Sequence, residues 1–508
     1  MKKIFITAAF IASMFSFGGC TSLDLDPVSS ITDPNYWKSA DQYNAFMVGL
    51  HTRMREHAWN FYLLGESRSD VFGDSPFGGE ASQGMERLPY NTINKENVGI
   101  SNYGNFYTNI NQVNLMIART KETTIVTEDT RNYYLGQAYG IRAYYYFQLL
   151  RSWGDVVIST EPTITLDVTN LAKAVSPAAD VMKLIKTDID ESAKYFGTDY
   201  SIKGNKSQWS KSATQMLKAE VYLWSAKQMG GGTTDAGTAK AALLDIQQGA
   251  KDLGLMDKFT DVFAYKQKGN KEIIFAFRNQ LKEYDLMNGS YGGNLLPQTS
   301  YLQTYYDAAT GEKFDIAKEN MFGLMRLGIK NTNLNRYDDK DSRKLATLKG
   351  AYNKNEKTGA LELVGLYPYK FQGIQDAGNS RSIVDDYPVY RYADLLLMLA
   401  EAKAMLGESP ATEINAVRQR AYGSNYDEKT VGFPNQAIDK DVNRALLEER
   451  FKEFMMEGRR WYDLRRFGSQ YVFEFTLATN GNEQKLLWPI DSGTLTNNRA
   501  LKQTPGYE

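Results

Sequence analysis

Apolar and polar residues follow a helical period over four segments of the chain. Within each segment, large apolar side chains recur three and four residues apart, which places them on one face of a helix. The segments are 135–153, 213–224, 392–406 and 442–467. Gly407 follows the third segment and is expected to end that helix, because glycine adopts the left-handed conformation at a helix C-terminus without steric cost. These patterns predict a predominantly helical protein.

Strand patterns are few and short. The run 272–277 (EIIFAF) is apolar, and 486–490 is a second candidate strand. Long stretches rich in Gly, Asn and Tyr lie between the helical segments, at 73–109, 279–306 and 331–390. Loops of this length inside a compact protein are usually functional or disordered.

The first twenty residues have the layout of a secretory signal. Two lysines precede an apolar run at 4–17, and two glycines precede Cys20. The run is too short to span a bilayer comfortably as a mature helix. A cysteine at the first mature position can carry acyl chains such as palmitate, and several chains give stable anchoring. We predict a signal peptide at 1–19, lipidation of Cys20 and a tether at 20–30; the alternative is a plain secreted protein with an incidental cysteine.

The composition excludes several classes of protein. Among 508 residues, 59 basic and 60 acidic side chains give a formal net charge of −1, so no global field attracts nucleic acid or an anionic bilayer. Cys20 is the only cysteine, which excludes an internal disulfide and a thiolate metal cluster. His51 and His57 are six residues apart, not the four that would put both on one helical face. The 33 Tyr, 24 Phe and 7 Trp suit sugar-binding surfaces and helical cores alike.

The sequence contains no sharp catalytic or cofactor motif. It lacks a GxxxxGK[ST] phosphate loop, a GxSxG nucleophile elbow and an HExxH zinc motif. We expect no cofactor, and whether a metal ion is bound stays open. Because two carboxylates suffice to hydrolyse a glycosidic bond, a surface glycoside hydrolase stays an alternative.

Charged and aromatic residues within the helical segments are interpreted as structural. Acids and bases of 448–466 lie three and four residues apart, a spacing typical of ion-pair networks on helices. Arg142 lies within an apolar stripe and is expected to be paired. Trp153, Trp224 and Trp461 occupy the same kind of stripe and are predicted to lie in the core.

Seven segments, in order along the chain, resemble motifs of the SusD/RagB family of outer-membrane lipoproteins. The most specific is GQAYGIRAYYYFQLLRSWGD at 136–155, which is similar to the family's GEA.FLRAYYYF.LV..FGD. The other six lie at 36–51, 103–114, 213–224, 387–402 (YPVYRYADLLLMLAEA), 447–468 (LEERFKEFMMEGRRWYDLRRFG) and 487–507. Thr504 stands where the closing motif of the family usually has Asn.

The resemblance implies a mostly α fold, a scaffold of TPR-like helix pairs with a variable, loop-rich subdomain and a few short strands. Residues 31–508 would form a single domain with variable inserts near 60–109 and 279–390. It also implies a non-catalytic lipoprotein, anchored by lipid and exposed on the cell outer membrane. Such a protein binds an oligosaccharide and delivers it to a SusC-like TonB-dependent transporter. RagB-like relatives take peptides, so a peptide-binding uptake lipoprotein is an alternative, as is a structural or adhesion lipoprotein.

Ligand contacts are expected between the scaffold motifs, where family members vary. Sugar sites combine flat aromatic faces with amides, carboxylates or arginines that hydrogen-bond to hydroxyl groups. By these criteria the candidate glycan-binding residues are Asp70, Phe77, Tyr90, Asn279, Glu283, Tyr284, Asp285, Asn288 and Tyr291, with Trp59 and Arg381 as weaker additions.

Overall fold

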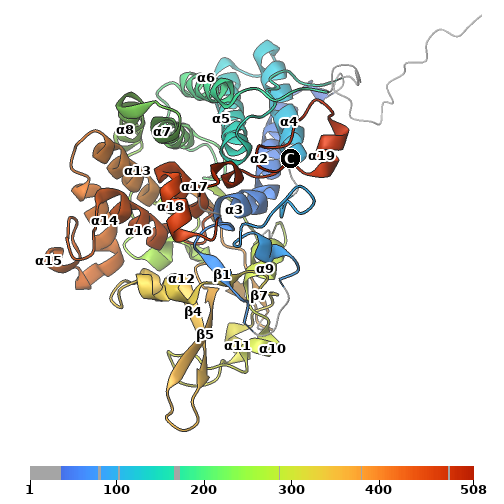
Figure 1. Ribbon diagram of the computed structural model, residues 1–508. Coiled ribbons are helices and arrows are strands. Elements are labelled where there is room, and N and C mark those ends of the chain that lie inside the picture. Colours follow the sequence, from blue (N-terminus) through green and yellow to red (C-terminus); the bar gives the residue numbers. More distant parts are fainter. Residues whose placement is uncertain are drawn as a thin grey trace, which may run out of the picture.

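The computed structural model describes residues 36–77, 82–100, 103–164, 172–284, 287–378, 380–478 and 481–508. The signal peptide, Cys20 and the tether predicted within 1–30 lie outside the described residues. Long helices fill the upper part of Figure 1, and short helices and strands fill the lower part. The expected mostly helical class with a few short strands is confirmed.

The helices differ greatly in length. The longer ones are α2 (Ala40–Glu56), α3 (Ala58–Glu66), α4 (Tyr103–Glu122), α5 (Glu128–Trp153), α6 (Ala178–Phe196), α7 (Lys211–Gln228), α8 (Gly232–Gly249), α13 (Tyr392–Met405), α14 (Ala411–Tyr422), α16 (Val442–Phe454), α17 (Arg460–Phe467), α18 (Ser469–Phe475) and α19 (Ser492–Asn497). The shortest are α9 (Gly293–Leu295), α10 (Thr299–Leu302), α11 (Ile316–Glu319), α12 (Arg343–Thr347) and α15 (Glu428–Val431).

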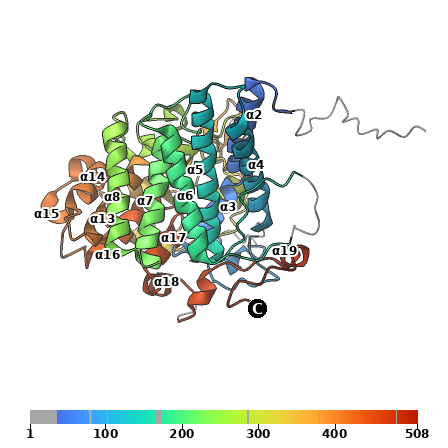
Figure 2. The same ribbon diagram turned by 90° about the horizontal axis from the view of Figure 1, so that it is seen from above.

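The long helices form a continuous row. In Figure 2 α2, α4, α5, α6, α7 and α8 follow one another; α13 packs beside α8, and α14 packs beside α13. Two glycines of α5 permit close packing, since a Cβ atom at Gly140 would collide with the indole of Trp209 and one at Gly136 would press on the ring of Phe196. The predicted core tryptophans Trp153, Trp224 and Trp461 are buried.

Gly407 ends α13 as predicted. Its φ of +74° lies in the left-handed region. The N–H of Gly407 donates to the carbonyl of Ala404 (3.2 Å), and the N–H of Glu408 donates to that of Lys403 (2.8 Å). This pair of bonds satisfies carbonyls that the helix end would otherwise leave without a partner.

Four antiparallel pairs of strands are seen among the described residues. They join β1 (Phe72–Asp74) to β3 (Gly328–Ile329), β2 (Ile273–Phe277) to β8 (Tyr387–Arg391), β4 (Leu348–Lys354) to β5 (Leu361–Pro368), and β6 (Ile374–Gln375) to β7 (Arg381–Ser382). The strand predicted at 272–277 is confirmed as β2. Residues 279–390, which we call the lobe, hold most of the short elements, and its β4–β5 hairpin projects from the bottom of Figure 1.

Two predictions about strands and loops are wrong. The stretch 331–390 is not one long loop, because it contains α12 and the β4–β5 hairpin. The predicted strand at 486–490 is irregular beyond Leu486. Pro489 has no N–H for a ladder, and this segment instead binds the end of α5, where the N–H of Trp488 donates to the carbonyl of Ser152 (2.8 Å).

The single helix predicted over 442–467 is also wrong, because it breaks between α16 and α17. Met456 and Gly458 both have φ +72° at the break. The carboxylate of Glu66, on α3, accepts the N–H groups of Met456 (2.8 Å), Arg459 (2.9 Å) and Arg460 (3.2 Å). A residue distant in sequence thus supplies acceptors for the backbone that the break exposes.

The charge-dense segment forms ion pairs, as predicted, but these pairs are buried and join residues far apart in sequence rather than three or four residues apart. Glu453 meets Arg391 (2.6 Å) and Arg343 (3.1 Å), and it also contacts Arg420. Burial alone would raise the pKa of Glu453, but these arginines hold it below its ordinary value. Arg142 pairs with Asp188 at 2.7 Å between α5 and α6. The pairs of Glu453 join α16 to α12, α14 and the strand β8.

Candidate functional site

Four of the predicted ligand residues are buried. Both carboxylate oxygens of Asp70 contact arginines, with Arg460 and Arg336 at 2.8 Å. Phe77 packs edge-on against Tyr305, and Tyr291 packs in the same way against Tyr62 and Phe371. The Nδ2 of Asn279 donates to the carbonyl of Asp385 (2.9 Å). These side chains present little or no surface to a ligand.

Arg381 is half-buried and binds backbone groups of the lobe. Its guanidinium donates to the carbonyls of Glu319 (2.9 Å), Gln372 (2.6 Å) and Lys318 (2.8 Å). Tyr90 is exposed, at 38%. Asp285 lies outside the described residues, and only the backbone of Asn288 is described.

The structure brings Glu283 and Tyr284 together at α2. Nη1 of Arg55 lies 3.2 Å from a carboxylate oxygen of Glu283, and its guanidinium lies 4.2 Å from the ring centre of Tyr284. The same Nη1 donates to the carbonyl of Arg278 (3.2 Å). We call Arg55, Glu283 and Tyr284 the Arg55 cluster; it fixes the start of the lobe to the helical row.

Trp59 lies about one helical turn beyond Arg55. Only His57 separates α2 from α3, and its φ of −83° and ψ of −4° are helical, so Arg55 and Trp59, four residues apart, share a side of the helical run. The half-buried Trp59 stacks on Tyr62 with ring centres 5.2 Å apart and planes at 9°. Stacking fixes the orientation of the indole, which suits a platform for a sugar ring.

A cleft of about 190 Å³ adjoins the Arg55 cluster. Side chains that line this Arg55 cleft include Asn44, His51, Arg55, Tyr134, Gln208, Arg278 and Glu283. Burial lowers the pKa of His51 to about 4, so the imidazole is neutral at pH 7. Its Nε2 accepts the N–H of Trp209 (2.9 Å). Amides, a carboxylate and a phenol in this cleft match the donors and acceptors that hydroxyl groups need.

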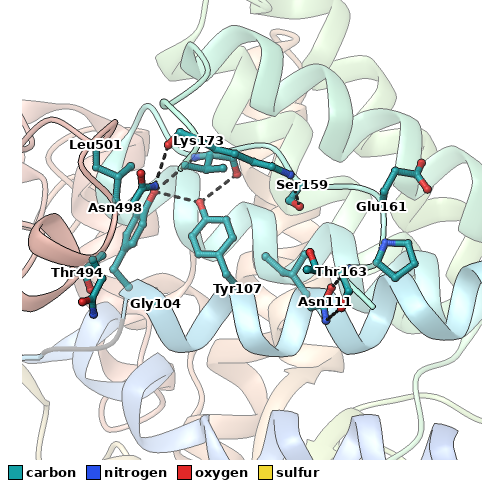
Figure 3. A pocket seen from close by; sticks show the side chains of 15 residues that line it. Gly104, Tyr107, Asn111, Ser159, Glu161, Thr163, Lys173, Thr494, Asn498 and Leu501 are labelled. Atoms are coloured by element: carbon teal, nitrogen blue, oxygen red, sulfur yellow. Dashed lines mark hydrogen bonds between the residues drawn. The ribbon is translucent and has the colours of Figure 1, made fainter. Parts of the chain in front are cut away.

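A larger cavity of about 450 Å³ lies between α4 and the C-terminal segment. Figure 3 shows Tyr107 and Asn111 on α4, facing Ser159 and Thr163 on one side and Asn498 on the other. We call it the Tyr107 cavity. Its volume falls in the range of small-molecule sites.

Many polar groups of the Tyr107 cavity already bind one another. The hydroxyl of Tyr107 donates to the carbonyl of Val157 (3.0 Å). Asn111 accepts the N–H of Thr163 (2.6 Å) and donates to its carbonyl (3.3 Å). Asn498 donates to the carbonyl of Lys173 (2.9 Å). The exposed Glu161 and Lys173 at the rim supply charged groups.

Sequence reasoning missed the Tyr107 cavity. Its wall on α4 belongs to the 103–114 segment, which was assigned to the scaffold, and its other walls come from 157–163, Lys173 and 494–501. The two tyrosines within 103–114 were a signal, but nothing in the sequence joins these distant segments. In the described part of the chain, no group of three or more His, Cys, Asp or Glu is placed to hold a metal ion. No helix there is both long and apolar enough to cross a bilayer.

Two family models match nearly the whole chain. The one described as the SusD family matches residues 225–507, and the one described as starch-binding associating with outer membrane matches residues 25–223. The boundary between them falls within α7, so it does not mark a gap between helices.

Solved structures and curated relatives agree with these matches. The structure of B. fragilis NanU is 50% identical, with a TM-score of 0.90 over 95% of this chain and 100% of that one. SusD-like protein P38 of Formosa agariphila is 25% identical over 100% of this chain and 99% of its own. The starch-binding protein SusD of Bacteroides thetaiotaomicron is 30% identical over 28% of this chain and 26% of its own.

Proposed function

The chain belongs to the SusD family, and from this premise we propose that it is a lipid-anchored protein of the outer-membrane surface that binds glycan for import. Members of the family bind glycan without catalysis. We propose further that a SusC-like TonB-dependent transporter receives the glycan. The main support for this proposal is that family models match both halves of the chain.

Anchoring would depend on Cys20, the only cysteine of the chain. Growth with a palmitate analogue that can be coupled to a dye should label the protein, and Cys20→Ala should abolish the label. The acylated protein should stay with the outer membrane after cell lysis and be cleaved by protease added to whole cells. Equal labelling of the Cys20→Ala protein would contradict anchoring at this residue.

Glycan contact is proposed at Trp59, Glu283 and Tyr284. Aromatic rings can cover the C–H face of a sugar, and the Glu283 side chain, 52% exposed, can accept hydroxyl hydrogen bonds. Each such bond replaces one to water and nets about 1 kcal/mol. We therefore expect modest dissociation constants, roughly micromolar to millimolar.

Calorimetric titration with a panel of oligosaccharides tests the proposal. Trp59→Ala and Tyr284→Ala should each weaken glycan binding by about tenfold, as expected for loss of about 1–1.5 kcal/mol at an aromatic contact. Tyr222→Ala is the matched control. Nζ of Lys186 lies 4.3 Å from the ring centre of Tyr222, so this tyrosine also contacts a cation, but it lines neither the Arg55 cleft nor the Tyr107 cavity. A control that loses as much affinity would refute the assignment of these residues.

The same titrations distinguish the alternatives. Binding of a peptide pool without glycan binding would favour peptide uptake. New reducing ends released from the bound glycan would indicate a hydrolase. Loss of glycan binding in Tyr107→Ala alone would indicate that the glycan binds in the Tyr107 cavity instead. Copurification of a TonB-dependent barrel with the tagged lipoprotein tests the proposed partner.

A further inference from the structure

Lys206 and Arg278 are cations that make no close ion pair. Both are half-buried, and neither makes an ion pair within 4 Å in the described part of the chain. Nζ of Lys206 donates only to the carbonyl of Asn270 (2.7 Å). By contrast, many buried arginines outside the lobe face carboxylates, as Arg391 does at 2.7 Å from Glu272.

These two cations line one recess of about 280 Å³, which we call the Arg278 recess. Its other polar walls are Asn205, Ser207, Gln280, and the Lys268–Asp386 ion pair of 3.1 Å. The recess and the Arg55 cleft share Asn205, Ser207 and Arg278. A ligand seated in the cleft can therefore place a substituent beside Arg278.

The backbone on both sides of Arg278 is fixed. Phe277 ends β2, which is paired with β8. The N–H of Asn279 donates to Oδ1 of Asp386 (3.1 Å), and Arg55 holds the carbonyl of Arg278 itself. The loop of Lys206 is docked on the same strand, since the carbonyl of Lys206 accepts the N–H of Ala276 (3.0 Å). Binding an anion here would require little ordering of the backbone.

The recess carries a local excess of positive charge. Among the residues that line it, Lys206, Lys268 and Arg278 outnumber one acid, Asp386, whose carboxylate is already bound by Lys268 and by the N–H of Asn279, and Asp252 acts on Lys206 from outside the lining. Burial lowers the pKa of Lys206 to about 8, so the lysine is still mostly protonated at pH 7. An anion would offset the cost of burying this charge. The excess contrasts with a net charge of −1 for the whole chain.

We infer that the Arg278 recess binds the carboxylate or sulfate group of an acidic glycan whose sugar rings lie in the Arg55 cleft. The planar guanidinium presents paired N–H donors that match two oxygens of either group, while Lys206 adds a point charge and Asn205 and Ser207 add neutral hydrogen-bonding groups. This inference rests on the proposed function, because it assigns a class of ligand to a glycan-binding protein.

A glycan array of neutral, uronate-bearing, sialylated and sulfated oligosaccharides tests the inference on the full-length folded chain. The unaltered protein should prefer acidic glycans, and its binding should weaken as sodium chloride is raised. Arg278→Gln should lower that binding by about tenfold or more, and Lys206→Gln by about threefold. Arg53→Gln and Lys266→Gln are matched controls, because both residues are exposed and neither lines the recess.

The outcomes separate the inference from the proposed function. Binding confined to uronate and sialylated glycans identifies a carboxylate ligand, and binding confined to sulfated glycans identifies a sulfate. Preference for neutral glycans, or equal losses in Arg278→Gln and Arg53→Gln, would overturn the inference and leave glycan binding intact. Failure to bind any glycan would defeat both. Thermal unfolding of each variant shows whether a loss of binding reflects a loss of folding.

Discussion

Two buried carboxylates, Glu449 of α16 in the helical scaffold and Asp385 of the lobe, are stabilised differently. Glu449 lies 2.7 Å from Arg343, on α12 of the lobe, and 2.9 Å from Arg418, on α14, and these cations outweigh burial and lower its pKa to about 2. In the lobe, Asp385 accepts the N–H of Gly373 (2.6 Å), and burial raises its pKa to about 7. The nearby Lys268 pairs with Asp386 instead.

The difference shows how each region gains its shape. Ion pairs in the scaffold join helices from distant parts of the chain, so removing one partner leaves an opposite charge buried. Other charged groups of the lobe bind backbone groups instead, as in the three carbonyls bound by Arg381. Ion pairs thus join α16 to α14 and to α12 of the lobe, where Asp341 is also neutralised by Arg343 (2.7 Å), whereas Asp385 and Arg381 bind backbone groups of the lobe itself.

Arg391→Met should have the largest effect on stability. Arg391 lies within 2.9 Å of Glu272, Glu453 and Glu457, and all four side chains are fully buried. Removing the cation leaves these acids with fewer partners, which we expect to lower the free energy of unfolding by about 3–5 kcal/mol. Urea unfolding followed by circular dichroism measures the change. A loss below about 1 kcal/mol would contradict the proposed role of neutralisation.

Asp385→Asn should change the pH dependence of stability. Between its ordinary pKa and about 7, the folded state keeps a proton on Asp385 that the unfolded chain releases, so the free energy of unfolding falls as pH rises through this window. The variant should be more stable than the parent near pH 8, by on the order of a few kcal/mol, and the difference should shrink near pH 5.

Thermal unfolding across this range provides the measurement. Burial also raises the pKa of Glu66 to about 7, so the Asp385→Asn variant should retain part of the parent's pH dependence. Superimposable profiles for the two proteins would mean that Asp385 does not titrate in this window.

Gly458→Ala tests the break between α16 and α17. A Cβ atom would lie 2.5 Å from the hydroxyl of Tyr387 and 3.0 Å from Cα of Tyr62, at a φ of +72°. We expect a loss of about 1–3 kcal/mol. Gly49→Ala is the control, because a Cβ atom there meets nothing within 4 Å and alanine favours a helix interior by about 0.5–1 kcal/mol. Equal changes in the two melting temperatures would argue against strain at the break.

Arg444→Met should have the smallest effect. Arg444 pairs with Glu474 at 2.6 Å, but their side chains are 29% and 44% exposed. Water solvates both charges and screens the pair, so we expect less than about 1 kcal/mol. The same unfolding assay, run on Arg391→Met in parallel, measures how much more a buried ion pair contributes to the free energy of unfolding than an exposed one. If Arg444→Met lowered the free energy of unfolding as much as Arg391→Met, burial would not explain the difference between exposed and buried ion pairs.

The recurrence of apolar residues was sufficient to predict the helices α5, α7 and α13 and the strand β2. The Gly407 helix end was predictable because its geometry depends on neighbours in sequence. The break after α16 was not, since it depends on Glu66 of α3. The β4–β5 hairpin was missed within a stretch rich in Gly, Asn and Tyr, because pairing between strands rather than an apolar period defines it.

Among the candidate ligand residues, sequence identified suitable chemical types but not their exposure. Asp70, Phe77, Asn279 and Tyr291 are buried, whereas Glu283 and Tyr284 meet Arg55 at the surface. Burial follows from packing among distant segments, and no local pattern reports it. For the same reason Arg278, next to a correctly predicted strand, was not recognised as a cation without a close ion pair.

The amino-acid sequence alone determined the helical class and the resemblance to one family, because periodicity and motif order are properties of the chain itself. Tertiary structure decided which charges neutralise one another, where the long helix breaks and which aromatic rings reach the surface. Those outcomes depend on distances between residues far apart along the chain, and only folding sets such distances.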